Sequence, residues 1–123
     1  MRLLIVDDSA TMRKIIMRGI RQSGLNVDEF LEAGNGKEAL QVLSSNGGVD
    51  VILTDVNMPE MNGLELLEAL KSSGETKDIP VVMITTEGSE AVVEKAKQLG
   101  VSGFIRKPFT PETLSSTLSS VMG

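Results

Sequence analysis

The chain has 123 residues, a formal net charge of −5 and neither cysteine nor histidine. A domain of this length buries roughly two thirds of its unfolded surface, so a hydrophobic core can form without disulfide or metal staples. The composition excludes disulfides, thiolate zinc sites and Ser-His catalysis, and the acidic balance argues against direct binding to nucleic acid.

The beginning of the chain lacks the layout of a secretory signal peptide. Its apolar run, Leu3–Val6, has only four residues and ends in Asp7 and Asp8. No stretch approaches the ~20 apolar residues of a membrane span. We therefore expect a single domain over residues 1–123, located in the cytoplasm and not inserted in a membrane.

The first half of the chain alternates short apolar runs with longer amphipathic segments. Leu3–Val6 predicts a strand, and Ser9 can cap a following helix that ends at Gly24. A weaker strand is expected over Glu29–Ala33. The next segment predicts a helix that stops at residues 47–48 and carries one apolar face, formed by Ala39, Leu40 and Leu43.

The second half continues the same alternation. Strands are expected over Val51–Asp55, Val81–Ile84 and around Phe104–Ile105. Helices are expected to begin near Gly63, at Ser89 and at Thr110, the first of them ending at Gly74. Five strands in strict alternation with five helices predict an α/β fold, a doubly wound parallel sheet with helices on both faces.

Charged residues follow three of the predicted strands. Asp7 and Asp8 come directly after the first, Asp55 closes the third and Lys107 follows the fifth. The carboxyl ends of parallel strands meet at one edge of a sheet, where open α/β folds place their ligands. Carboxylates ~4 Å apart repel each other by roughly 4 kcal/mol at an effective dielectric near 20, so such a cluster needs a cation. Mg²⁺ prefers oxygen donors of this kind, and a site that holds it is expected to bind a phosphoryl group.

Each of these residues also has a simpler interpretation. Asp8 can be only a helix cap or turn residue, and Thr85, at the end of the fourth strand, can be a cap rather than a functional hydroxyl. Lys107 can be a solvated lysine at a strand end, although the following Pro108 restricts its backbone. Because strand alternation sends Asp7 and Asp8 to opposite faces, both reach the site only if the strand ends there.

Together these residues resemble the receiver domain of response regulators, of the CheY-like kind, over essentially the whole chain. The matching positions, in order and spacing, are Asp7-Asp8-Ser9, Asp55 with Met58-Pro59 and Gly63 after it, Thr85, and Lys107-Pro108-Phe109. The resemblance implies a flavodoxin-like sheet with strand order 2-1-3-4-5. It also implies that Asp55 accepts a phosphoryl group from the phosphohistidine of a histidine kinase.

The same resemblance implies how the acidic residues share the work around the phosphoryl acceptor. Mg²⁺ is held by Asp8, Asp55 and the main-chain carbonyl of Asn57. Asp7 acts on the metal through water, and Lys107 neutralises charge from the other side. The catalytic apparatus then consists of positioning and charge neutralisation.

Signal output is implied by the resemblance as well. The Thr85 hydroxyl moves toward the phosphoryl group, and Phe104 turns into the vacated space. The docking surface includes Phe104 together with Val93, Lys97 and Val101, for which the alternative is ordinary core or helix packing. The chemotaxis pattern often has tyrosine where Phe104 stands, so this chain lacks a hydroxyl that could bond to the partner.

Because the chain ends about one helix after Lys107, we expect output by docking to another protein. The leading prediction is a stand-alone chemotaxis regulator that is phosphorylated by a histidine kinase and docks on a flagellar motor switch, with a phosphatase as a further partner. A phosphorelay intermediate or a regulator of a non-motility pathway is the alternative. Asn57 and Glu87 match the residue pair of chemotaxis receivers with rapid self-dephosphorylation, which predicts a short-lived signal.

Two other classes of function fit part of the pattern. An aspartate-nucleophile phosphatase carries a second aspartate two residues after the nucleophile, but Asn57 stands there and cannot exchange protons. A receiver-shaped module that is never phosphorylated is expected to lack Asp8, Asp55 or Lys107, and all are present. We therefore predict a phosphoacceptor that gains and loses its own phosphoryl group, rather than a turnover enzyme.

Overall fold

The computed structural model describes residues 1–86 and 89–122, and within them strands and helices alternate along the chain. The strands are β1 (Arg2–Val6), β2 (Glu29–Ala33), β3 (Val51–Thr54), β4 (Val81–Thr85) and β5 (Gly103–Arg106). The helices are α1 (Ala10–Gln22), α2 (Gly36–Asn46), α3 (Gly63–Lys71), α4 (Glu90–Gln98) and α5 (Pro111–Met122). Among these described helices, none combines the length and hydrophobicity needed to span a bilayer.

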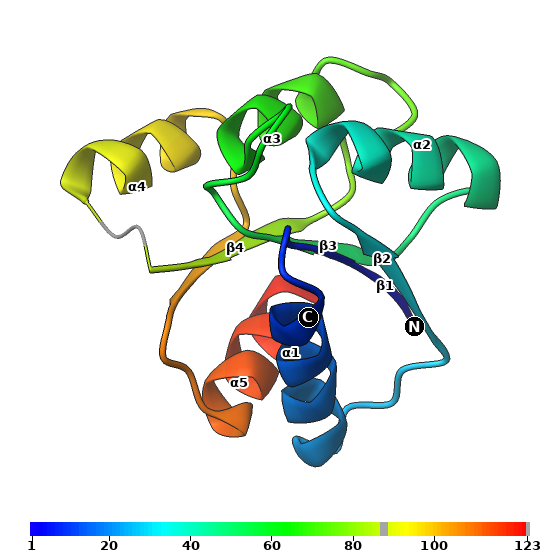
Figure 1. The fold of residues 1–123 in the computed structure, drawn as a ribbon, viewed down its shortest axis with the longest axis vertical. Helices are drawn as coiled ribbons and strands as arrows, with labels where there is room; N and C mark the ends of the chain where they lie inside the picture. Colours follow the sequence, from blue (N-terminus) through cyan, green and yellow to red (C-terminus); the bar gives the residue numbers. More distant parts are fainter. Residues whose placement is uncertain (87–88, 123) are drawn as a thin grey trace.

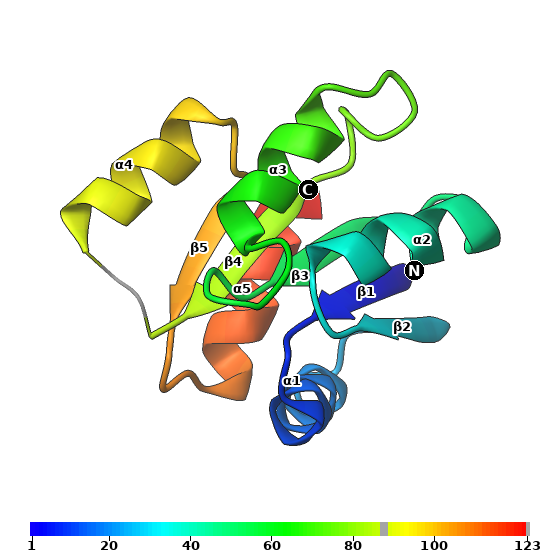
Figure 2. The same ribbon diagram turned by 45° about the horizontal axis from the view of Figure 1, so that its top comes forward.

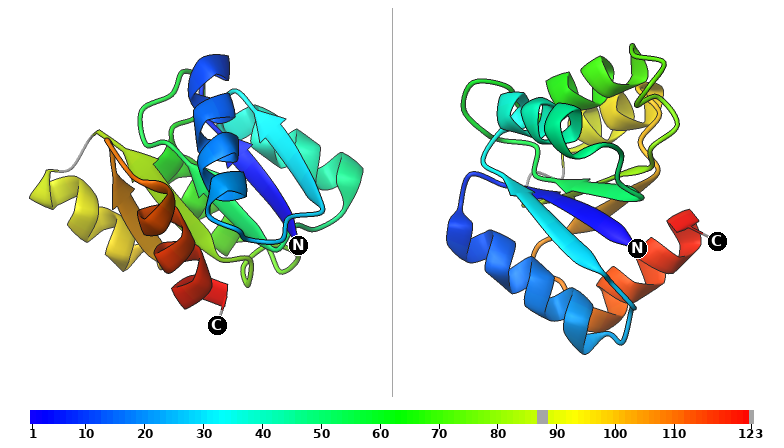
Figure 3. Two further views of the ribbon diagram at one scale, coloured as in Figure 1. Left: turned by 90° about the horizontal axis from the view of Figure 1, so that it is seen from below. Right: turned by 90° about the vertical axis from the view of Figure 1, so that its right-hand side faces the viewer.

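The strands form one parallel sheet in the order β2-β1-β3-β4-β5, which confirms the expected order (Figure 2). Crossover helices lie on both faces of the sheet, with α2, α3 and α4 on one face and α1 and α5 on the other (Figure 1). Helices α1 and α5 contact each other beneath the sheet (Figure 3). The doubly wound architecture predicted from the alternation is therefore confirmed.

Each face of the sheet has its own core because alternate strand residues point to opposite sides. In β1, Leu4 and Val6 join the core under α2, α3 and α4, whereas Leu3 and Ile5 join the core under α1 and α5. All of these side chains are at most 1% exposed. Burial on both faces explains why this strand is a continuous apolar run rather than an alternating pattern.

The register aligns the carboxyl ends of the inner strands. Val6 of β1 is paired with Ala33 of β2 and with Thr54 of β3, where β3 ends one residue earlier than predicted. One further backbone hydrogen bond follows on each strand: the Asp7 N–H donates to the Ala33 carbonyl at 3.0 Å, and the Asp55 N–H donates to the Val6 carbonyl at 2.9 Å. These bonds place Asp7 and Asp55 at the same level of the sheet edge.

Helix starts follow the local sequence closely. The Ser9 hydroxyl accepts a hydrogen bond from the Met12 N–H at 3.1 Å, and the Ser89 hydroxyl accepts one from the Val92 N–H at 3.3 Å. Both serines are the N-caps that the sequence suggests for α1 and α4. Gly24, just beyond α1, has a φ of 87°, a conformation that favours glycine.

The third helix ends earlier than predicted. It stops at Lys71 rather than at Gly74. The Thr76 hydroxyl donates to the Leu70 carbonyl at 2.7 Å, so a side chain from the following turn satisfies a carbonyl that a longer helix would bond. The predicted end at Gly74 was wrong because the Thr76 hydroxyl, which bonds the Leu70 carbonyl, comes from outside the helix.

Candidate functional site

Three carboxylates gather at the carboxyl edge of the sheet. Asp7, Asp8 and Asp55 each offer an oxygen, and these oxygens lie within 4.8 Å of one another. The first two residues follow β1, and Asp55 follows β3, the neighbouring strand. Because the strand ends at Val6, the adjacent Asp7 and Asp8 are not bound by strict alternation and both reach the site. We call this group the acidic cluster.

The ammonium of Lys107 joins the acidic cluster from the other end of the chain. Its Nζ donates to Asp7 Oδ2 at 3.2 Å and to Asp55 Oδ2 at 3.3 Å. The Lys107 side chain is only 13% exposed, so it is not the solvated strand-end lysine of the simpler interpretation. Its backbone N–H donates to the Thr85 carbonyl at 3.0 Å, and its peptide bond to Pro108 is cis. Segments that follow β1, β3 and β5 thus meet at one point.

Asp55 is held in a defined orientation at the mouth of the site. Its Oδ1 accepts a hydrogen bond from the Val56 N–H at 2.6 Å, while Oδ2 faces Lys107. The side chain is 13% exposed, which leaves an approach from solvent. Gly63, the first residue of α3, lies so close that an added Cβ would be 2.2 Å from the Asp55 carbonyl oxygen. The start of α3 therefore fixes the backbone that carries this carboxylate.

Asp7 is the buried member of the acidic cluster, with 2% exposure, whereas Asp8 is exposed. Burial raises the pKa of Asp7 above its ordinary value of 3.8, because desolvation disfavours the charged form. The hydrogen bond from the Ser9 N–H, at 2.9 Å, and the charge of Lys107 oppose this rise, and the charge of Asp55 adds to it. Ionisation of Asp7 is therefore less favourable in the folded protein than in water.

The charges of the acidic cluster are not balanced by protein groups alone. Among the described residues, the Lys107 ammonium pairs with two of the three carboxylates, Asp7 and Asp55, and no ion pair reaches Asp8. Ionised carboxylates up to 4.8 Å apart repel each other by roughly 3 kcal/mol or more at an effective dielectric near 20. A divalent cation would offset this repulsion, and a donor set of carboxylate oxygens fits a hard cation such as Mg²⁺. Softer metals prefer thiolate or imidazole ligands, and the sequence has neither.

Comparison with known proteins adds an independent line of evidence. The family model described as "Response regulator receiver domain" matches residues 3–119. The chain belongs to this family. Chemotaxis protein CheY1 of Helicobacter pylori is 48% identical to it over 123 residues, covering 100% of this chain and 98% of that one. Chemotaxis protein CheY-3 of Vibrio cholerae is 42% identical over 121 residues, covering 98% of this chain and 91% of that one.

A solved structure agrees with the family and with the fold. The chemotaxis protein CheY4 of Vibrio cholerae, crystallised at low pH, superposes on this receiver with a TM-score of 0.85. The two chains are 38% identical, and the match covers 98% of this chain and 97% of that one. The strand order described above is therefore shared with a chemotaxis receiver.

Two residues that the family resemblance singles out lie near the acidic cluster of this receiver. Thr85 is the last residue of β4, is 1% exposed and is paired in register with Arg106 of β5. Asn57 is exposed in the loop between β3 and α3, two residues after Asp55. Their roles stay predictions. Glu87, the second residue expected to tune dephosphorylation, lies outside the described residues.

The residues predicted to form the docking surface lie together. Val93, Lys97, Val101 and Phe104 line one groove of about 150 Å³ between α4 and β5. Phe104 is half-buried and packs against the core under α2, α3 and α4. Of the apolar side chains of α4, only Ala96 is buried; the others remain at least partly exposed. We call this the α4–β5 groove; its function as a docking surface stays a prediction.

Arg13 contacts the site although the sequence pattern does not single it out. Its Nη1 donates to the Asp7 carbonyl oxygen at 2.6 Å, and its Nε donates to Glu32 Oε1 at 2.9 Å. The available signal is position, because Arg13 lies one helical turn after the Ser9 cap. Glu32 gives no local signal, since its proximity depends on the pairing of β1 with β2.

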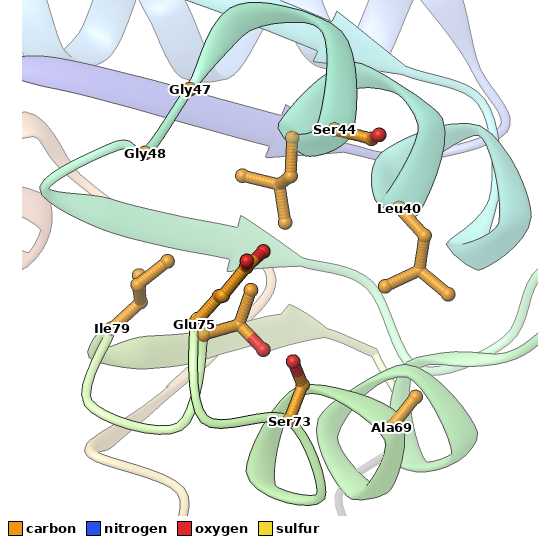
Figure 4. Close-up of a pocket in the computed structure, with 10 residues that line it drawn as sticks. Leu40, Ser44, Gly47, Gly48, Ala69, Ser73, Glu75 and Ile79 are labelled. Atoms are coloured by element: carbon orange, nitrogen blue, oxygen red, sulfur yellow. The ribbon is translucent and has the colours of Figure 1, made fainter.

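A second cavity, of about 490 Å³, lies far from the acidic cluster. It opens between the end of α2 and the segment that leads from α3 to β4 (Figure 4). Its lining includes Leu40, Gly47, Ser73 and Ile79, at the edge where β3 and β4 begin. No carboxylate of the acidic cluster lines it, so it is not part of the site of this receiver.

Proposed function

We propose that this receiver accepts a phosphoryl group on Asp55 from a histidine kinase and, once phosphorylated, docks on a target protein in chemotaxis. The observation that carries the proposal is the Asp55 carboxylate, which lies beside the Lys107 ammonium and within 4.8 Å of oxygens from Asp7 and Asp8. Chemotaxis proteins that are 42% and 48% identical over nearly the whole chain support the pathway. A single domain over residues 1–123, working in the cytoplasm, is part of the proposal.

Asp55 is the nucleophile of the proposed reaction. One of its carboxylate oxygens bonds to phosphorus, the P–N bond of the donor phosphohistidine breaks, and the imidazole nitrogen keeps that electron pair. The product on Asp55 is an acyl phosphate. The Lys107 Nζ, already 3.3 Å from Asp55 Oδ2, can bond the phosphoryl oxygens from one side. A positioned ammonium of this kind stabilises the charge of the transition state.

The acidic cluster would hold a cation on the side of Asp55 away from Lys107. Bound Mg²⁺ supplies positive charge against the carboxylates and the anionic phosphoryl oxygens. Asp8, Asp55 and the main-chain carbonyl of Asn57 would hold it, and the buried Asp7 would act through water. The exposure of Asp8 suits a cation that keeps several of its waters. The same residues therefore hold the cation and orient the nucleophile.

Phosphorylation would be converted into a change of shape at the α4–β5 groove. The acyl phosphate carries about −1.5 to −2 charges and strong hydrogen-bond acceptors where a carboxylate stood. Thr85, which ends β4, is proposed to turn its hydroxyl toward them. The space that the Thr85 hydroxyl leaves would admit the ring of Phe104. Phe104 lies on the neighbouring strand β5, where it is paired in register with Met83 of β4. A flagellar motor switch protein is the proposed target of the reshaped groove.

The phosphoryl group is expected to leave by hydrolysis rather than by turnover catalysis. Asn57 stands where an aspartate-nucleophile phosphatase carries its acid and base, and an amide cannot exchange protons in that role. Attack by water is therefore slow unless the site or a partner phosphatase assists it. Asn57 and Glu87 are proposed to set this rate within the receiver.

A phosphorelay intermediate, or a regulator outside motility, would use the same chemistry at Asp55. One observation favours this second candidate: Phe104 stands where the chemotaxis pattern often has tyrosine, and its ring offers no hydroxyl to a partner. The identity to chemotaxis proteins along nearly the whole chain favours the motility pathway.

The proposal is tested by labelling the purified protein with acetyl phosphate and MgCl₂. Intact-mass measurement should show a single added phosphoryl group on the wild type and none on Asp55→Asn. Asp50→Asn is the matched control, since Asp50 precedes β3 and its carboxylate instead accepts a hydrogen bond from the Arg2 N–H at 2.7 Å. Equal labelling of Asp55→Asn and the wild type would refute the assignment of Asp55 as the acceptor.

A further inference from the structure

The loop that carries Asp7 and Asp8 is braced by an ion pair between α1 and β2. Arg13 of α1 donates from Nη1 to the Asp7 carbonyl oxygen at 2.6 Å and from Nε to Glu32 Oε1 at 2.9 Å. The Arg13 side chain is 18% exposed and the Glu32 side chain 42%. One guanidinium therefore ties the end of β1 to α1 and to β2 at the edge of the sheet where the acidic cluster lies.

The Asp8 side chain has fewer contacts to hold it than the Asp7 side chain has. The Asp7 carboxylate is held from two sides, by the Ser9 N–H on Oδ1 and by Lys107 on Oδ2. Within residues 1–86 and 89–122, the Asp8 side chain makes no hydrogen bond and no ion pair that would hold it. The Asp7 carbonyl belongs to the planar peptide unit that joins Asp7 to Asp8, so Arg13 fixes the plane from which Asp8 projects.

We propose that Arg13, held in place by Glu32, is a positioning residue for the divalent-cation site: it directs Asp8 toward the acidic cluster and does not itself touch the cation. The inference rests on the proposed function, in which Asp8 is a ligand of Mg²⁺. An arginine is needed because its planar fork donates in two fixed directions at once. A lysine ammonium on a flexible stem keeps the charge but does not reproduce both bonds.

Substitutions that separate charge from geometry test this role. In Arg13→Lys the affinity of the full chain for Mg²⁺ should fall about tenfold, the lower end of the range for residues that orient metal ligands. Glu32→Ala should give a similar loss, whereas Glu32→Gln keeps an oxygen that accepts from Nε and should restore affinity close to that of the wild type. The readout is a titration with MgCl₂ in which the amide resonances of residues 7–9 and 55–57 are followed by NMR.

The protein offers a matched control at the other end of the same two strands. Arg2 of β1 donates from Nε to Glu29 Oε1 of β2 at 2.8 Å and from Nη1 to the carbonyls of Asn46 and Gly48. Arg2→Lys therefore breaks an equivalent fork at the edge away from the acidic cluster. The free energy of unfolding, measured with urea in the absence of metal, should fall by a similar small amount in Arg2→Lys and Arg13→Lys. Only Arg13→Lys should bind Mg²⁺ more weakly.

The outcomes distinguish the positioning role of Arg13 from the proposed phosphorylation of Asp55. Unchanged Mg²⁺ affinity in Arg13→Lys and Glu32→Ala, or an equal loss in Arg2→Lys, would overturn the positioning role and leave phosphorylation of Asp55 untouched. A wild type that binds Mg²⁺ and responds to Arg13→Lys, but takes no phosphoryl group from acetyl phosphate, would support the positioning role and refute the proposed function. A wild type that does not bind Mg²⁺ would overturn both.

Discussion

Asp7 is the most deeply buried carboxylate of the acidic cluster, and its burial has a consequence for stability. Its pKa in the folded state is raised above the ordinary 3.8, first of all by desolvation. As the pH rises above the ordinary value, the unfolded chain loses the proton before the folded chain does. The contribution of Asp7 to the free energy of unfolding is therefore greatest at low pH and falls as the pH rises through the folded pKa.

Asp7→Asn should consequently be more stable than the wild type at pH 7 in the absence of divalent cations. Asparagine has nearly the shape of aspartate and can still accept the Ser9 N–H bond, but it carries no charge to desolvate. The difference in the free energy of unfolding should shrink as the pH is lowered, and it should be smallest below 3.8, where the wild-type carboxyl is largely protonated in both states. Urea unfolding at a series of pH values measures it.

Asp78 provides the control for this experiment, because it is exposed and Asp78→Asn should change the free energy of unfolding at pH 7 by no more than about 0.5 kcal/mol. Added MgCl₂ should reduce the difference in the free energy of unfolding between the wild type and Asp7→Asn. The reason is that a cation that binds only the folded state stabilises the wild type, whose acidic cluster is intact. A less stable Asp7→Asn at pH 7 would mean that the ion pair with Lys107 outweighs the desolvation of Asp7.

The proposed reacting groups of this receiver were predictable from the sequence, but the residues that hold them in place were not. Asp7, Asp55 and Lys107 each follow a strand of one parallel sheet, so the sequence places them at its carboxyl edge. Their proximity along that edge depends on the strand order. The contact between Arg13 and Glu32 depends on the register of β1 with β2 and on the rotamers of two long side chains. Neither is encoded in a local pattern.

At the scale of a single element, the start of α3 is the most constrained position near the site. A Cβ on Gly63 would lie 2.2 Å from the Asp55 carbonyl oxygen and 3.0 Å from the Val56 Cα, both of which are backbone atoms. Gly63→Ala must therefore displace α3 or the loop that carries Asp55. We expect a loss of about 1–3 kcal/mol in the free energy of unfolding, measured with urea, and weaker binding of Mg²⁺.

Gly74→Ala is the matched control for that prediction. No atom lies within 4 Å of a Cβ added to Gly74, and its φ is not in the positive region. This variant should stay within about 0.5 kcal/mol of the wild type, as expected for an exposed surface position. Similar losses in Gly63→Ala and Gly74→Ala would show that the close approach of α3 to Asp55 is not a constraint.

Helix starts were easier to predict than helix ends. Ser9 and Ser89 bond N–H groups three residues away, so the information lies within one turn of sequence. The end of α3 at Lys71 instead involves the Thr76 hydroxyl, which returns from the following turn to the Leu70 carbonyl. The glycine at position 74 was therefore a misleading signal, because the turn leaves the helix before reaching it.

For the whole molecule, alternation along the chain predicts a parallel sheet with two covered faces, but it does not determine the strand order. That order came from the family resemblance, and the pairing of β1 with both β2 and β3 confirms it. Its consequence is functional, because β4 and β5 lie between the acidic cluster and the α4–β5 groove. Thr85 ends β4 beside the cluster, and Phe104 of β5 lines the groove, so the two strands connect both ends of the proposed switch.

This arrangement predicts that a phosphoryl mimic at Asp55 changes binding at the α4–β5 groove. With beryllofluoride and MgCl₂, affinity for the flagellar motor switch protein should rise about tenfold, a typical coupling between two sites. Phe104→Ala should lose most of that rise while still binding beryllofluoride, because the ring proposed to link the two sites is absent. Phe30→Ala, on β2 at the opposite edge of the sheet, should respond like the wild type. Calorimetric titration of the target measures each affinity, and an equal rise in Phe104→Ala and Phe30→Ala would exclude Phe104 from the switch.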